Sequence, residues 1–170
     1  MPLSKIDALD HRILCELLRS SCVSDRQMAR NLGTSQPTIT RRRSNVEKKL
    51  IDGYTVIPRW QDIGYEIVVF TFLKGDKSVQ KPGVYDEILR EVRDWFSKEP
   101  NVIFAATGEG LGFDGVMISF HKCYSDYTDF RKKHTSALSK FSTESQSFIV
   151  DINSPIVLKP FHLKYLADAK

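Results

Sequence analysis

The stretch that decides the fold of the N-terminal part is residues 24–50, SDRQMARNLGTSQPTITRRRSNVEKKL. Ser24 opens a capping-box pattern, S-x-x-Q, and Gly33 is a natural helix end, so a short helix is expected between them. A serine two positions before Pro37 is a favourable N-cap, and proline suits a first helical turn, so a further helix is expected over residues 36–49. Two helices joined by a Gly-containing turn are typical of a helix-turn-helix.

A leading helix completes this module. From Leu9 onward, apolar residues recur every four positions, which predicts an amphipathic helix over residues 7–19. On the helix predicted for residues 36–49, Ile39 and Val46 share one side, which must pack on the other two helices. The opposite side therefore faces water or a partner.

The outward side of that helix has the chemistry of a DNA reader. Gln, Thr and Arg side chains hydrogen-bond base edges, and the N-terminal turns of a recognition helix reach furthest into the major groove. Three successive arginines cannot all point outward, and we expect Arg43 to cover the core with its stem while its charge reaches the edge. The residues predicted to bind DNA are Ser35, Gln36, Pro37, Thr38, Thr40, Arg41, Arg42 and Lys48.

The charge distribution supports a polyanion partner. Residues 1–60 hold 11 Lys and Arg against 6 Asp and Glu, whereas residues 61–170 hold 14 against 15. Charge alone fits a solvated basic helix surface equally well. The longest apolar run, Ile67–Phe70, is far too short to cross a bilayer, and the first residues do not form a secretion signal. We therefore expect a cytoplasmic protein without membrane partners, whose three cysteines are reduced thiols.

The C-terminal part has the order β-α-β-β-α-β. Period-two and helical patterns predict strands over 63–74, 102–106, 116–120 and 148–152, and helices over 84–96 and 127–141. This is the ferredoxin-like order, in which both helices cover one sheet face, so the other face is expected to be buried by dimerisation. The predicted fold class is α+β: a (winged) helix-turn-helix domain, 1–60, joined to a ferredoxin-like effector-binding and oligomerisation domain, 61–170. Residues 54–57 are expected to form a linker strand closed by Pro58.

A glycine-rich stretch, residues 108–115, lies between the two middle strands. Dinucleotide binding needs a helix after such glycines, and here a strand follows, which argues against that function. Two interpretations stay open: a hairpin loop that needs positive φ angles, or a backbone-lined pocket whose carboxylates accept the ammonium group of an amino acid. The candidate effector-binding residues are Thr107, Gly108, Glu109, Gly110, Gly112 and Asp114.

Several motifs together resemble one family. They are IDALDHRIL (6–14), MARNLGTS (28–35), IDGY (51–54), DIG (62–64) and Thr107-Gly108 with Asp114. The chain from Ile6 to about Leu158 resembles the leucine-responsive (Lrp/AsnC) regulators. The resemblance implies dimers, or tetramers and octamers built from them, that bind double-stranded DNA and in many cases sense amino acids. It implies that Ser35–Arg42 read DNA and that Thr107–Asp114 form part of an effector site between dimers.

Two departures from the family and two other functions are relevant. The family usually has an aliphatic residue at the position of Arg43, and its hairpin is shorter and poorer in glycine. The same architecture resembles that of sirohaem decarboxylases, a possible enzymatic function, and a non-specific architectural DNA-binding protein is a third possibility. However, the four histidines lie far apart, His134 is on an apolar helix face that suggests a structural role, and His121-x-Cys123 is too sparse for zinc. We therefore predict no catalytic residue, metal ligand or cofactor.

Overall fold

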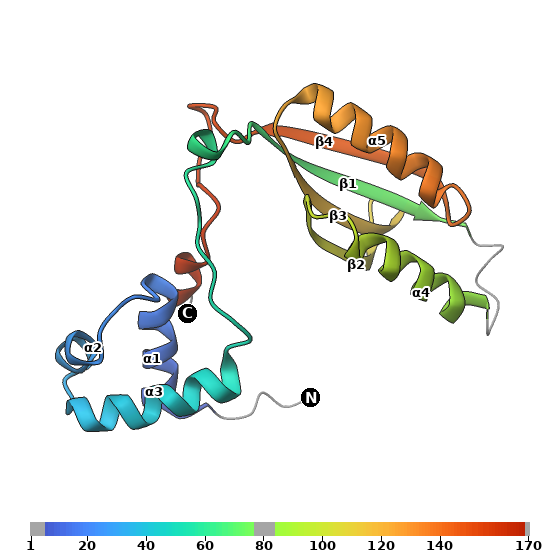
Figure 1. The fold of residues 1–170 in the computed structure, drawn as a ribbon. Helices are drawn as coiled ribbons and strands as arrows, with labels where there is room; N and C mark the ends of the chain where they lie inside the picture. Colours follow the sequence, from blue (N-terminus) through green and yellow to red (C-terminus); the bar gives the residue numbers. More distant parts are fainter. Residues whose placement is uncertain (1–5, 77–83, 169–170) are drawn as a thin grey trace. The chain divides into compact units, whose positions relative to one another are not determined.

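The computed structural model describes residues 6–76 and 84–168. The chain divides into two compact units: Met1–Ile57 with Lys159–Lys170, and Pro58–Leu158 (Figure 1). The expected division into 1–60 and 61–170 therefore differs from the structure at the C-terminal segment, which belongs with the helix-turn-helix.

The first unit is a three-helix module. Its helices are α1 (Ala8–Arg19), α2 (Asp25–Leu32) and α3 (Gln36–Leu50). The Oγ of Ser24 accepts the N–H of Gln27 at 3.2 Å, so the predicted cap of α2 is present. Gly33 ends that helix at φ +66°, a left-handed conformation that favours glycine. The buried core of the unit is Ile13, Leu17, Met28, Ala29, Ile39 and Val46.

The C-terminal segment packs on α1. A 3₁₀ helix, η3 (Leu163–Asp168), lies beside α1, and Ala167 is buried there (Figure 1). Arg19 donates to the Asp168 carboxylate at 2.6 Å and, at 3.4 Å, to the carbonyl of Ala167. Contacts made at the far end of a chain leave no periodicity in the sequence, which is why a boundary drawn from local pattern excluded this segment.

Two predicted strands are absent within the described part of the chain. Residues 54–57 form no strand, and Val56 is 84% exposed. The sequence also predicts that residues 156–158 extend or follow the last strand, but Ile156 lies in a turn and Leu158 in a bend. The Tyr54 hydroxyl instead donates to Glu47 of α3 at 2.8 Å.

The second unit is a ferredoxin-like domain, as predicted. It begins with η1 (Trp60–Ile63) and continues with β1 (Ile67–Gly75), α4 (Val84–Ser97), β2 (Val102–Gly110), β3 (Phe113–His121), α5 (Tyr124–Leu138) and β4 (Ser142–Asp151). The sheet order is β2-β3-β1-β4, and all its neighbouring strands are antiparallel. The first strand begins four residues later than expected, because residues 60–63 form η1, which ends at Gly64 with φ +76°.

Both helices cover the same sheet face (Figure 1). Ile67 and Val69 of β1 and Met117 of β3 pack there against aromatic residues of α4 and α5. The alternate residues of the strands therefore point to the other face. Pairing places Val68 beside Phe120 and Phe70 beside both Ile118 and Phe148 on that second face.

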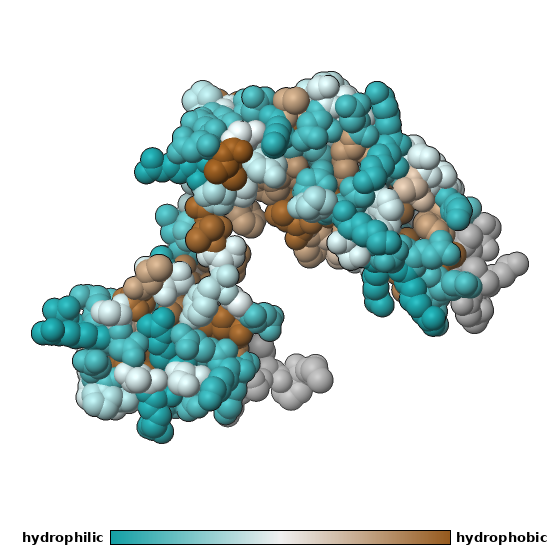
Figure 2. Space-filling model, in the orientation of Figure 1, coloured by the Kyte–Doolittle hydropathy of each residue, from teal (hydrophilic) through white to brown (hydrophobic). Residues whose placement is uncertain are grey.

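This second face, here named the open face, is apolar and partly exposed. Phe104 is 49% exposed and Phe148 is 66% exposed, which is uncommon for phenylalanine on the surface of a soluble monomer. Hydrophobic residues also reach the surface elsewhere in both units (Figure 2). The open face is therefore an exposed apolar surface on the side of the sheet away from the helices.

Candidate functional site

The outer side of α3 presents polar and basic side chains. Its exposed members are Gln36, Pro37, Thr40, Arg41, Ser44, Asn45, Lys48 and Lys49. Five of the predicted DNA-binding residues are thus exposed together, while Thr38 is half-buried and Ser35 caps the helix. Asn45 was not among the predicted residues, although its position one helical turn after Arg41 places it toward the same side.

The hydroxyls near the start of α3 are engaged within the unit. The Oγ of Ser35 lies 2.8 Å from Oγ1 of Thr38, within hydrogen-bond distance. Thr40 donates to Asp25 at 2.6 Å, and this bond is the main cause that lowers the pKa of the Asp25 carboxyl. Thr40 therefore joins α3 to the first turn of α2, which fixes the angle between the two helices.

The three consecutive arginines have three different environments. Arg42 lies 2.8 Å from the Asp7 carboxylate and 3.0 Å from that of Asp10, so its guanidinium is held against the start of α1. Its hydrogen bond to Asp10 is the main cause that raises its pKa. Arg41 is exposed, and within residues 6–76 and 84–168 no hydrogen bond or ion pair of its side chain is found. Of the two arginines predicted to bind DNA, Arg41 and Arg42, only Arg41 has an exposed guanidinium without a partner among the described residues.

Arg43 fastens α3 to α2. Its Nε donates to Glu47 at 2.8 Å, and its Nη1 donates to the carbonyl of Val23 at 2.8 Å and to Asp25 at 3.0 Å. The hydrogen bond to Glu47 is the largest cause that raises the pKa of the guanidinium. The charge thus lies at the edge of the core, as expected from the sequence, and its contacts form a polar clamp between α3 and the start of α2.

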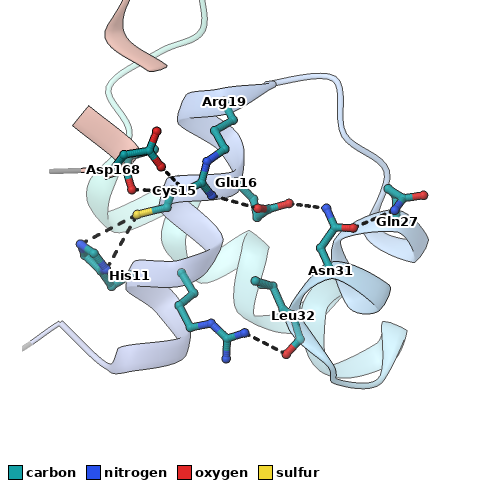
Figure 3. Close-up of polar contacts among 10 residues, drawn as sticks. His11, Cys15, Glu16, Arg19, Gln27, Asn31, Leu32 and Asp168 are labelled. Atoms are coloured by element: carbon teal, nitrogen blue, oxygen red, sulfur yellow. Dashed lines mark hydrogen bonds and ion pairs between the residues drawn. The ribbon is translucent and has the colours of Figure 1, made fainter. Parts of the chain in front are cut away.

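A polar network also fixes α2 against α1 (Figure 3). Glu16 accepts from Asn31 at 2.5 Å and from Arg19 at 3.1 Å. Asn31 in turn accepts from Gln27 at 2.8 Å, and Arg12 donates to the carbonyl of Leu32 at 3.2 Å. The helix that supports α3 is therefore positioned by several hydrogen bonds besides its core contacts.

The glycine-rich stretch is mostly strand, which corrects the expected loop. β2 continues to Gly110 and β3 begins at Phe113, so only Leu111 and Gly112 form the turn. Their φ angles, +54° and +80°, are both positive, as the common two-residue hairpin turn requires. Positive φ was expected of glycines here, yet a leucine holds one of the two positions and is 82% exposed.

Four of the six predicted effector residues line one cavity of about 740 Å³ between α4 and the sheet. They are Thr107, Gly108, Glu109 and Asp114, whereas Gly110 and Gly112 lie outside it. Asp114 Oδ2 accepts the backbone N–H of Gly75 at 2.9 Å, which fixes the carboxylate in place. The apolar lining that α4 contributes includes Ile88, Leu89, Val92 and Phe96, none of which was predicted to belong to a site.

The histidines do not gather into a catalytic or metal site. His121 is fully buried and its Nε2 lies 2.9 Å from the Ser119 hydroxyl, while His134 is 2% exposed among aromatic rings of the same domain. No group of three or more His, Cys, Asp or Glu side chains in the described residues is arranged to hold a metal ion. None of the helices described is both long and apolar enough to span a membrane.

Comparison with curated proteins gives helix-turn-helix regulators. The chain is 30% identical over 131 residues to an uncharacterized HTH-type transcriptional regulator of Pyrococcus horikoshii, covering 75% of this chain and 80% of the relative. It is 29% identical over 163 residues to another from Pyrococcus furiosus, covering 94% and 99%. No protein-family model matches the chain.

Solved structures share the whole architecture. An AsnC family transcriptional regulator from Agrobacterium tumefaciens matches with a TM-score of 0.73 at 18% identity, over 95% of this chain and 99% of its own. A transcriptional regulator of Neisseria meningitidis in complex with L-Met matches with a TM-score of 0.71 at 17% identity, over 89% and 92%. The curated relatives, the three-helix module and these structural matches together identify the chain as a member of the Lrp/AsnC family of helix-turn-helix transcriptional regulators.

Proposed function

We propose that this regulator reads double-stranded DNA with the outer side of α3 and that Arg41 is its principal base- or phosphate-contacting side chain. The proposal rests on the different environments of the three arginines. Arg42 and Arg43 form ion pairs with carboxylates of their own unit, whereas Arg41 is exposed. Gln36, Asn45 and Lys48 project from the same helix and supply amide and ammonium donors. Arg42 contributes by holding α3 against α1.

Dimerisation through the open face is part of this proposal. Phe104 and Phe148 lose their exposure if a second copy covers that face, and apolar burial is the dominant favourable term in association. A two-fold protein then reads two half-sites spaced by about one helical turn of DNA, or a multiple of it.

We further propose that the ferredoxin-like domain senses an amino acid. The similar regulator of Neisseria meningitidis was crystallised as a complex with L-Met. In this chain, the fixed Asp114 carboxylate offers an acceptor for an ammonium group at a cavity of ligand size. Thr107, Gly108 and Glu109 line the same cavity and support the assignment.

Selection of DNA from a random pool by the full chain, followed by binding measurements on the selected site, tests the DNA-reading proposal. Arg41→Ala should weaken specific binding by roughly 5- to 150-fold, corresponding to the 1–3 kcal/mol of a bidentate base contact. Lys140→Ala is the matched control, because it removes one exposed positive charge from the other unit. Equal affinity of the Arg41→Ala variant and the control would contradict the assignment.

A further inference from the structure

Thr40 combines an exposed position on α3 with a hydrogen bond inside its own unit. It lies on the outer side of the helix, one helical turn from Gln36 and from Ser44. Its Oγ1 donates to Asp25 Oδ2 at 2.6 Å. The N-terminal turns of a recognition helix reach furthest into the major groove, so a DNA-reading α3 brings the Thr40 hydroxyl to the base edges.

The proton of this hydroxyl has a fixed direction. A threonine hydroxyl carries one proton and two lone pairs, and an ionised carboxylate can only accept. The bond from Thr40 is the main cause that lowers the pKa of the Asp25 carboxyl from its ordinary 3.8, so Asp25 is ionised at neutral pH. Thr40 is therefore the donor in this bond, and its single proton points at Asp25 and away from the solvent.

The Asp25 carboxylate is itself held in one orientation. Its second oxygen, Oδ1, accepts from Arg43 Nη1 at 3.0 Å. Arg43 is anchored in turn by Glu47, which accepts from Nε at 2.8 Å, and by the carbonyl of Val23, which accepts from Nη1 at 2.8 Å. A guanidinium has donors only, so each oxygen of Asp25 has its own partner and the carboxylate is not free to turn away from Thr40.

The Thr40 hydroxyl can therefore only accept on its outer side. Serine and threonine hydroxyls ordinarily serve base donors and base acceptors alike, because their proton rotates to suit the partner. In the major groove, the amino groups at N6 of adenine and N4 of cytosine are donors, whereas O6 of guanine and O4 of thymine are acceptors. An oxygen whose proton is already used pairs with the amino bases and repels the keto oxygens.

We propose that Thr40 is a specificity-determining residue that accepts a hydrogen bond from an exocyclic amino group, so that one position of each half-site carries adenine or cytosine on the contacted strand. Asp25 is a positioning residue that acts through Thr40, because it holds the hydroxyl proton away from the DNA. The inference rests on the DNA reading by α3 proposed above and names the class of base that one residue of this helix accepts.

Selection from a random DNA pool, run in parallel with the full-length wild type and four variants, tests the proposal. Thr40→Val keeps the shape of the side chain and removes the hydroxyl, so one position of the selected site should lose its preference. At that position the wild type should favour A or C over G or T on one strand by about three- to tenfold, the value of one hydrogen bond. Thr40→Ser keeps the hydroxyl and should keep the preference.

Asp25→Asn should invert the preference. Arg43 donates to the Oδ1 position, so the amide oxygen of this variant must lie there and the amide NH2 must face Thr40. The amide then donates to Oγ1 and the hydroxyl proton turns outward, so the same position should change from A or C to G or T. Asp52→Asn is the matched control, because it removes the same charge from an exposed position just beyond the end of α3.

The outcomes separate this inference from the proposed function. If Thr40→Val selects the wild-type site, or if the preference divides A·T from G·C pairs without regard to strand, the inference is wrong and DNA reading survives. The inference is equally wrong if Thr40→Ser loses the preference, or if a folded Asp25→Asn variant keeps the wild-type base. Thermal unfolding checks each variant, and Thr40→Val against Thr40→Ser decides the base contact if Asp25→Asn does not fold. If the wild type selects no site, the DNA reading itself fails.

Discussion

Replacing Arg43 by alanine should destabilise the helix-turn-helix unit more than any other single arginine change in α3. The side chain is only 20% exposed and makes three short contacts, with Glu47 and the Val23 carbonyl at 2.8 Å and with Asp25 at 3.0 Å. A hydrogen bond to a charged group contributes about 1.5–3 kcal/mol when buried. These contacts share one guanidinium at the edge of the core, where water can replace part of them, so we expect a total loss of about 2–3 kcal/mol rather than the sum.

Thermal unfolding of the full chain, followed by helical circular dichroism, measures this loss. For a unit of this size, 1 kcal/mol corresponds to about 4–8 °C, so the Tm of the helix-turn-helix should fall by about 10–20 °C. Arg41→Ala is the matched control, because it removes the same charge from the neighbouring exposed position and should change stability by less than about 0.5 kcal/mol. If the Tm of the Arg43→Ala variant equals that of the Arg41→Ala variant, the contacts of Arg43 do not stabilise the helix-turn-helix unit and the reasoning is wrong.

The clamp also has a pH signature. The pKa values of Asp25 and Glu47 lie below their ordinary values of 3.8 and 4.5, the first chiefly through the Thr40 hydroxyl and the second chiefly through Arg43. A carboxyl whose pKa is lowered on folding stabilises the fold above its ordinary pKa, and that contribution is lost as the pH falls through the folded value. The wild type should therefore lose stability below about pH 4.5, and the Arg43 variant should lose less over the same range.

Three further predictions concern other parts of the chain. Burial lowers the pKa of His134 from 6.5 to about 4, so its contribution to stability is complete above pH 6.5 and falls as the imidazole must be protonated. The free energy of unfolding of the ferredoxin-like domain should drop by about 3 kcal/mol between pH 6.5 and pH 4. In urea unfolding at these two pH values, the His134→Phe variant should show a much smaller drop. Leu111→Asn should raise the free energy of unfolding by about 1 kcal/mol, because leucine at φ +54° is strained; a lower value would show that its exposed side chain makes a contact that matters more. Ala167→Glu should lower the Tm of the helix-turn-helix unit, whereas Leu166→Glu, at a position 60% exposed, should leave it unchanged.

The sequence predicts the helices and the order of strands well because local patterns determine them. Caps at Ser24 and Ser35 and the end at Gly33 are local signals, and the structure confirms all three. The buried position of His134 likewise follows from helical periodicity. The failures are non-local: η3 packs on α1 through contacts across nearly the whole chain, and Tyr54–Ile57 has the composition of a strand but forms none in the structure.

The candidate site shows the same limit. Periodicity places Arg41 and Lys48 on the outer side of α3, but only the fold reveals that Asp7 and Asp10 hold Arg42. The glycine motif predicts an effector site at residues 107–114, and the structure brings four of the six predicted residues to one cavity. A further part of that cavity comes from α4, whose residues follow an ordinary amphipathic pattern that gives no sign of a site.

The chain crosses between its units twice, after Ile57 and after Leu158, so the ferredoxin-like domain is inserted into the sequence of the helix-turn-helix unit. A protease that cuts at one crossing yields two fragments that are held together only by the packing of η3 on α1. Release of an intact helix-turn-helix unit requires two cuts, and that unit then consists of two peptides. Exchanging the DNA specificity of this regulator for that of a relative is likewise a two-segment graft. The recognition helix must be transferred with a matching C-terminal segment, since Ala167 and Asp168 pack on α1, which belongs to the same three-helix unit.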